Sequence, residues 1–345
     1  MSLFFWRKQK AGAAAAPPDP FAVTPTAAVT PVPAAPEPPA HPSAMREVYA
    51  LALQSRRAAD ATALPDPGQM TLLLAASREF AQIGIQPRYT PRRPSLLPQL
   101  LEALDDEDAS LRALSRIVSQ DPQLTGDLLR TANSAMYRVS STPVESVERA
   151  AAMLGTRGIR SLLSASLVHP LATSGGSLGR FGDMLWDHSL YSASAAEAWA
   201  GRSQDADPFT AHLLALMHGL GCVAVYRVLA DLYAAQPALP RDAAVIAGAL
   251  TTNAAVTAAR IAASWGLTER TRQALEAQSS AAPVNDHLPL SQALQFGLLT
   301  GAVTLLCKHG KLPANEALQQ IVAGGFPAAQ AERIWDRMQR AYVTP

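Results

Sequence analysis

The chain has 345 residues, with 29 basic and 28 acidic side chains and a formal net charge of +1. A nearly neutral chain has no general attraction for nucleic acid, so we expect no nucleic-acid partner. The two cysteines, Cys222 and Cys307, lie far apart, which argues against a disulfide framework or a zinc site and favours a cytoplasmic protein. Apolar residues recur at helical rather than alternating spacing, which predicts an all-α fold.

Residues 1–44 differ in composition from the rest of the chain. After the first ten residues, Ala, Pro, Val and Thr dominate, with ten prolines between residues 17 and 42. Prolines at this density favour extended, solvated chain, so the sequence predicts a disordered tail. Its tip, Phe4, Phe5 and Trp6 followed by basic residues, is either a frayed end or an anchor for a partner or an anionic membrane surface.

Residues 45–85 are predicted to form a helical hairpin extension. Apolar residues at spacings of three and four predict one helix over 45–61 and a second over 69–83. The Pro-Asp-Pro-Gly sequence at 65–68 is typical of the turn between them.

The main domain is predicted over residues 86–285 and begins with five short helices. A serine at 146 can cap one of these helices, and Gly155 is placed to end it. Two basic residues, Arg157 and Arg160, follow at the start of the next helix. The five helices are expected over about 96–104, 111–118, 122–132, 147–154 and 156–167.

The most apolar run in the chain is LLALMHGLGCVAVY at 213–226, which only His218 interrupts. Asp207 and Pro208 upstream are typical of a helix start. Fourteen residues are too few for a membrane span, which needs about twenty, so we expect a helix through a soluble core. The preceding helix carries His188, a candidate partner of His218.

Helical patterns continue to the end of the chain. Within the main domain we expect helices over 243–263 and 268–278, separated by Trp265-Gly266. A C-terminal helical extension is predicted over 286–345. Its last helix places Ile334, Trp335 and Met338 on one stripe, which favours burial.

Several of these segments resemble one known family. IVSQDPQLTGDLLRTANSAMY at 117–137, LWDHSL at 185–190 and LLALMHGLG at 213–221 are similar to the HDOD domain, the HD-related output domain. The resemblance implies an all-α fold, with a helical N-terminal lobe packed on a lobe related to HD-type metal phosphohydrolases.

Those hydrolases hold metal with a first histidine, a His-Asp pair and a later aspartate. By resemblance, His188 matches the first histidine and His218 the histidine of the pair, whereas Gly219 stands in place of the aspartate. Neutral imidazoles do not balance the charge of a divalent ion. We therefore expect no metal, no other cofactor and no catalytic residue at these three vestigial HD positions. Instead, the histidines are expected to link two core helices by hydrogen bonds.

The resemblance implies a non-catalytic signal-transduction domain, because HDOD domains accompany bacterial sensory modules. We expect it to act by binding a signalling protein. Two alternatives stay open. One is a sensor that binds a nucleotide in the vestigial cleft, for which Arg157 and Arg160 are the candidate ligands. The other is a residual metal-dependent phosphohydrolase acting on a nucleotide such as cyclic di-GMP.

Overall fold

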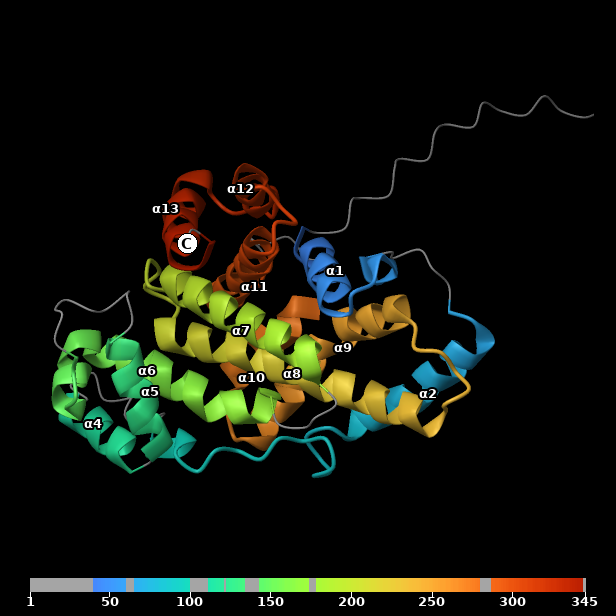
Figure 1. Cartoon of the computed structure of the whole chain (residues 1–345), viewed down its shortest axis with the longest axis horizontal. Helices are drawn as coiled ribbons and strands as arrows, with labels where there is room; N and C mark the ends of the chain where they lie inside the picture. The colour runs from blue at the N-terminus through green and yellow to red at the C-terminus, as the bar shows by residue number, and fades with distance from the viewer. Residues whose placement is uncertain are drawn as a thin grey trace, which may run out of the picture. The chain divides into compact units, whose positions relative to one another are not determined.

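The computed structural model describes residues 40–59, 65–99, 111–120, 122–133, 143–173, 178–279 and 287–343. Every regular element in these ranges is a helix, which confirms the predicted all-α class (Figure 1). Residues 1–39, which hold most of the predicted tail and its aromatic tip, lie outside the described residues. The first helix begins at Ala40, so the last residues of the segment predicted as tail belong to it.

The helices follow one another with short connections. In chain order they are α1 (Ala40–Ala52), η1 (Arg56–Ala59), α2 (Pro67–Gln82), α4 (Leu111–Ser119), α5 (Pro122–Ala132), α6 (Val147–Thr173), α7 (Gly179–Ala200), α8 (Pro208–Ala235), α9 (Ala243–Ser264), α10 (Glu269–Glu276), η2 (Ala277–Ser279), α11 (Pro289–Lys308), α12 (Ala314–Ala323), α13 (Ala328–Met338) and η4 (Gln339–Val343). The elements η1 and η2 are 3-10 turns, and η4 is a turn of π-helix.

Local signals in the sequence set several helix ends. Asp207 accepts a hydrogen bond from the Thr210 amide at 2.6 Å, and Pro208 occupies the first turn of α8. Ser146 accepts from the Arg149 amide at 3.1 Å, as its predicted capping role requires. Gly155 has φ 68° and ψ 175°, a conformation that kinks α6 where the sequence predicts a helix end.

Helices α4, α5 and α6 form a small helical group. Its core includes Leu114, Val118 and Leu128, all fully buried. Asn133, just past α5, donates its side-chain amide to the carbonyls of Leu129 and Val144 and accepts from the Val144 amide. The asparagine thus ties the end of α5 to the segment that leads into α6.

Helices α7, α8, α9 and α11 form the main bundle, in which α7 packs against both α8 and α11 (Figure 1). Glycines mark the closest approaches between them. A Cβ added at Gly221 of α8 would lie 2.3 Å from the Ala254 carbonyl oxygen of α9. One added at Gly297 of α11 would lie 2.5 Å from the Ser192 carbonyl oxygen of α7. Small residues at these points let the helix backbones pack closely.

The central helix α8 is longer than its apolar run indicated. It spans 28 residues, so the prediction that this segment is too short to cross a membrane is wrong. By length and hydropathy alone, three helices of the described part, α8, α9 and α11, could cross a membrane. Their most apolar windows are 94%, 61% and 89% buried within the structure. Packing against neighbouring helices therefore accounts for most of this apolar surface.

Both flanking extensions pack on the bundle. Helix α1 buries Met45, Val48 and Tyr49, and contacts α11 and α9. Helix α13 buries the predicted stripe of Ile334, Trp335 and Met338. The bundle and its extensions therefore share one apolar core.

Candidate functional site

His188 lies in the core between α7 and α11. Its side chain is 1% exposed, and Nε2 lies 3.2 Å from the Leu298 carbonyl oxygen and 3.2 Å from the Ser192 hydroxyl oxygen. A carbonyl oxygen can only accept, so Nε2 carries the proton. Burial lowers the pKa of His188 from 6.5 to about 4, although the Leu298 contact opposes the shift. The ring is therefore neutral at physiological pH.

His218 lies on α8 and belongs to a different set of contacts. Its Nδ1 lies 3.9 Å from the Cys222 sulfur, which lies 3.6 Å from the Tyr49 hydroxyl of α1. Burial raises the pKa of Cys222 to about 12, so the sulfur is a thiol. His188 thus joins α7 to α11, and His218 faces a contact with α1. His188 therefore links two core helices by a hydrogen bond, as expected, and a direct contact between His188 and His218 stays a prediction.

Gly219 of α8 lies against the Ser189 side chain of α7. A Cβ added at Gly219 would lie 2.1 Å from the Ser189 hydroxyl oxygen, which donates to the Leu185 carbonyl at 2.8 Å. An aspartate here would require the Ser189 hydroxyl to move from its present position. Among the described residues, no three His, Cys, Asp or Glu side chains gather closely enough to hold a metal ion. The residues present at the vestigial HD positions therefore do not fit the metal of HD-type hydrolases.

Arg157 and Arg160, the candidate nucleotide ligands, follow the kink at Gly155 in α6. Their side chains lie outside the described residues. Their proposed role stays a prediction.

Sequence reasoning missed a partly buried polar cluster where the small helical group meets the main bundle. Oε2 of Glu197 on α7 accepts from the Ser161 hydroxyl of α6 at 2.8 Å and lies 3.0 Å from Nδ1 of His212 on α8. We call these three residues the junction cluster. His212 is 6% exposed, and its Nε2 is buried without a hydrogen-bond partner in the described part of the chain. The signal was Glu197, an isolated acid in the alanine-rich second half of its helix.

Comparison with known families settles the wider identity. Residues 90–281, more than half of the chain, match the model of the HDOD domain. The chain belongs to the HDOD family. The resemblance drawn from the sequence motifs is thereby confirmed.

Solved structures share the HDOD fold at low sequence identity. An HDOD domain protein with unknown function from Geobacter sulfurreducens has a TM-score of 0.50 and 18% identity, covering 80% of this chain and 100% of that one. A protein from Shewanella amazonensis SB2B, named provisionally as a phosphohydrolase, has a TM-score of 0.53 and 22% identity. The match covers 78% of this chain and 94% of that one. A protein from Marinobacter aquaeolei VT8, named provisionally as a signal transduction protein, has a TM-score of 0.50 and 18% identity. The match covers 79% of this chain and 63% of that one.

One curated relative, an uncharacterized protein of Treponema pallidum (strain Nichols), is 23% identical over 176 residues. The match covers 51% of this HDOD protein and 33% of the relative, so the chain spans about a third of that protein.

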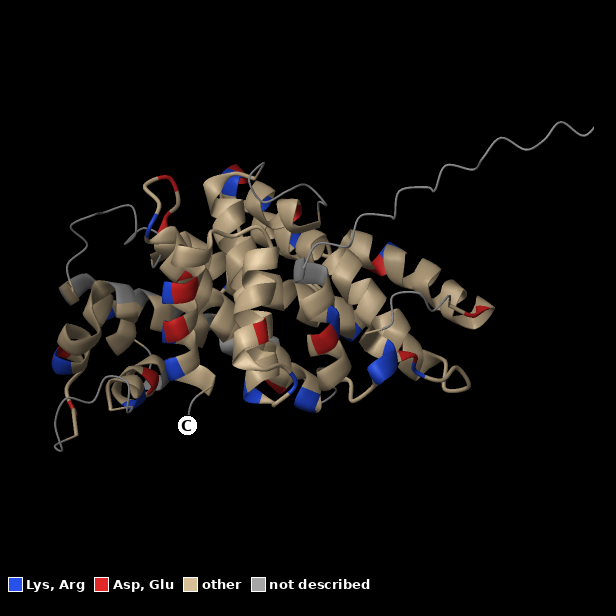
Figure 2. Ribbon diagram, turned by 90° about the horizontal axis from the view of Figure 1, so that it is seen from above, with Lys and Arg blue, Asp and Glu red and all other residues tan. Residues whose placement is uncertain are grey.

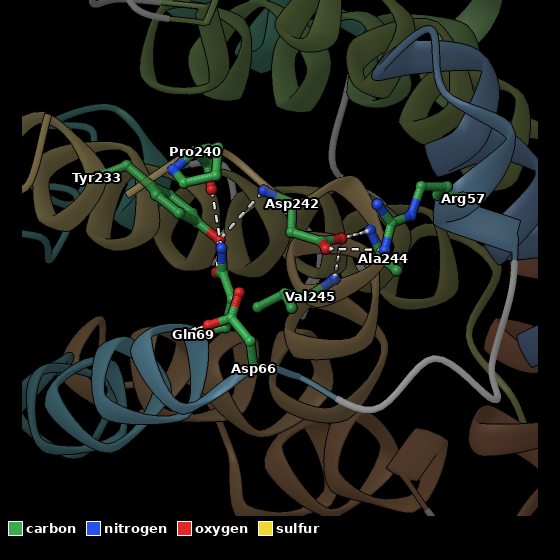
Figure 3. Close-up of polar contacts among 8 residues, drawn as sticks. All are labelled: Arg57, Asp66, Gln69, Tyr233, Pro240, Asp242, Ala244 and Val245. Carbon is green, nitrogen blue, oxygen red and sulfur yellow. Dashed lines mark hydrogen bonds and ion pairs between the residues drawn. The ribbon is translucent and has the colours of Figure 1, made fainter. Parts of the chain in front are cut away.

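The HDOD protein has a polar network where α2 meets the loop between α8 and α9 (Figure 3). Gln69, which is 2% exposed, donates to the Pro240 carbonyl at 2.8 Å and accepts from the Tyr233 hydroxyl at 2.5 Å. Asp242 caps α9 and pairs with Arg57 at 3.4 Å. These groups are engaged in holding the helix ends together.

Two surface hollows lie beside this network and share Gln54 and Ser55, just past α1. The first, of about 570 Å³, is lined by both signs of charge, including Arg57 and Asp242. The second, of about 720 Å³, we call the basic hollow. It is lined by Glu47, Ala50, Leu51, Gln54, Ser55, Arg56, Ala59, Arg180, Leu306 and Lys311. Neither hollow is lined by His188 or His218.

Proposed function

We propose that this HDOD protein is a cytoplasmic regulatory domain that acts by binding a signalling protein and catalyses no reaction. One observation carries the proposal. The position that HD-type hydrolases fill with a metal-binding aspartate is Gly219, and Ser189 occupies the space that its side chain would need.

The histidines support the same conclusion. Nε2 of His188 donates to the Leu298 carbonyl deep in the core, so this ring could reach a metal only through Nδ1. Neutral imidazoles do not balance the charge of a divalent ion, and Gly219 supplies no carboxylate that would do so.

Protein binding fits the surface better than nucleic-acid binding does. Acidic and basic segments are scattered over the described helices and often adjacent (Figure 2). Sequence-independent binding to a phosphate backbone uses clustered cations instead. The name of the Marinobacter protein, a signal transduction protein, agrees with a regulatory role.

The decisive experiment measures metal content and turnover on the purified full chain. We expect iron, manganese and zinc well below one per chain, and no hydrolysis of bis(p-nitrophenyl) phosphate or cyclic di-GMP. Tightly held metal near one per chain, with turnover that is lost in His218→Ala, would overturn the proposal.

A second experiment locates the partner. Affinity capture with the full chain is compared with capture by residues 38–345, which keep the whole of α1. Partners retained by the shorter protein bind the helical body. Partners lost with the tail bind through it, and Phe4→Ala, Phe5→Ala and Trp6→Ala then test the aromatic tip against a partner or anionic vesicles.

A further inference from the structure

We infer that the basic hollow binds an acidic segment of a partner protein, anchored by aliphatic side chains. The inference rests on the proposed function and names its binding surface. The first ground is charge. Arg56 of η1, Arg180 of α7 and Lys311 after α11 converge on the hollow from three separate segments. All three are exposed, and none forms an ion pair with a described residue.

Two cations close in sequence to these are paired instead. Arg57 pairs with Asp242, and Lys308 pairs with Asp187 at 3.0 Å. Among the described residues, the basic hollow holds three cations without an ion pair and one acidic lining residue, Glu47. An acidic partner would complete this charge pattern, and charge complementarity guides both encounter and orientation.

The pKa of His309 is shifted by cations of the same group. Burial lowers its pKa, and Lys308, Arg180 and Lys311 lower it further, while Asp187 opposes them. Two of these three cations line the basic hollow.

The apolar residues of the hollow indicate which kind of anionic ligand it fits. Its floor is formed by Ala50 and Leu51 of α1 and by Leu306 of α11, and none of the described lining residues is aromatic. A nucleotide site commonly stacks the base on an aromatic ring, which this hollow does not offer. An aliphatic floor rimmed by cations instead matches a peptide that carries leucine among aspartates and glutamates.

Gln54 adds an independent observation. Its φ is +55°, the only positive φ of a non-glycine among the described residues. It follows α1 in a left-handed cap, in which the Ser55 amide donates to the Ala50 carbonyl at 2.9 Å. Glycine adopts this conformation without strain, so a glutamine here is unfavourable for folding alone. Its exposed side chain lines both hollows, which gives a reason for its presence.

The test uses fluorescence anisotropy with the full chain and a labelled peptide, LEALDDEDAS, which is residues 101–110 of this chain and holds five acids among aliphatic residues. The control peptide, LQALNNQNAS, replaces every acid with its amide. We expect saturable, salt-sensitive binding of the acidic peptide and at least about ten-fold weaker binding of the control.

The variant Arg56→Glu/Arg180→Glu/Lys311→Glu should weaken peptide binding at least about ten-fold. The matched variant Arg78→Glu/Arg202→Glu/Arg333→Glu makes the same charge change at exposed arginines outside the hollow and should bind nearly as the parent does. Gln54→Gly should leave the melting temperature unchanged or higher while weakening binding, an outcome that a purely structural role does not produce.

Failure of the acidic peptide to bind, or equal loss in the two triple variants, would overturn the inference. Tighter binding of ATP or cyclic di-GMP that displaces the peptide would assign the hollow to nucleotides and overturn it as well. These results are distinguishable from failure of the proposed function, which is read from metal content and phosphodiester turnover.

Discussion

The vestigial HD positions and the junction cluster hold buried histidines in the same bundle, yet their surroundings differ. His188 is held by a carbonyl and a hydroxyl in an apolar core, where burial keeps it neutral. His212 faces the Glu197 carboxylate, and its second nitrogen has no partner among the described residues. The position of a histidine within a family motif therefore says less about its chemistry than the groups that contact it do.

The largest expected effect follows from restoring the missing aspartate. Gly219→Asp places a buried carboxylate against Ser189, so we expect a loss of unfolding free energy of about 4 kcal/mol or more. Urea denaturation measures it. Gly219→Ala should cost less, and Ser189→Ala should relieve part of that cost, because the Ser189 oxygen makes the closest contact. A stable Gly219→Asp protein that binds manganese would contradict this account of the site.

Acid should destabilise the protein through His188. The unfolded chain takes up a proton near pH 6.5, whereas the folded chain does so only near pH 4. Between these values the unfolded state binds more protons, so stability is full above pH 6.5 and falls as pH falls, by about 3 kcal/mol in all. His188→Gln should lack this component when unfolding is compared at pH 7 and pH 4.5. An equal loss in both proteins would show that His188 is not the titrating group.

The junction cluster should depend on the charge of Glu197. Glu197→Gln keeps the shape of the side chain but removes the charge that Ser161 and His212 contact, so we expect a loss of about 2 kcal/mol in urea denaturation. Glu332→Gln, an exposed change of the same chemistry, serves as the control and should cost almost nothing. Equal effects of the two changes would mean that the cluster contributes no stability.

The smallest effect is expected at Ser161. Ser161→Ala removes one of the donors to Glu197 and should cost about 1 kcal/mol. The double variant Ser161→Ala/Glu197→Gln should lose less stability than the sum of the two single losses, because both changes affect the same hydrogen bond. Strict additivity would indicate that Ser161 stabilises α6 through another contact.

Sequence reasoning succeeded where the signal was local. Caps at Asp207 and Ser146 and the break at Gly155 depend on residues within one turn, so they could be assigned from spacing alone. It failed on the extent of the central helix, because an apolar run does not show where more polar turns continue the same helix. It also missed the junction cluster, whose two contacts join residues 15 and 36 positions apart along the chain.

The sequence by itself determined the helical class and the family, and it predicted that Gly219 stands where HD-type hydrolases have an aspartate. Only the tertiary structure decided what occupies that position, because the contact between Gly219 and Ser189 depends on how closely α7 and α8 approach. It also decided that His188 faces α11 and that cations from three segments meet at the basic hollow. Periodicity and caps are encoded within a few residues, whereas the partners of a side chain are set by packing between segments distant in the chain.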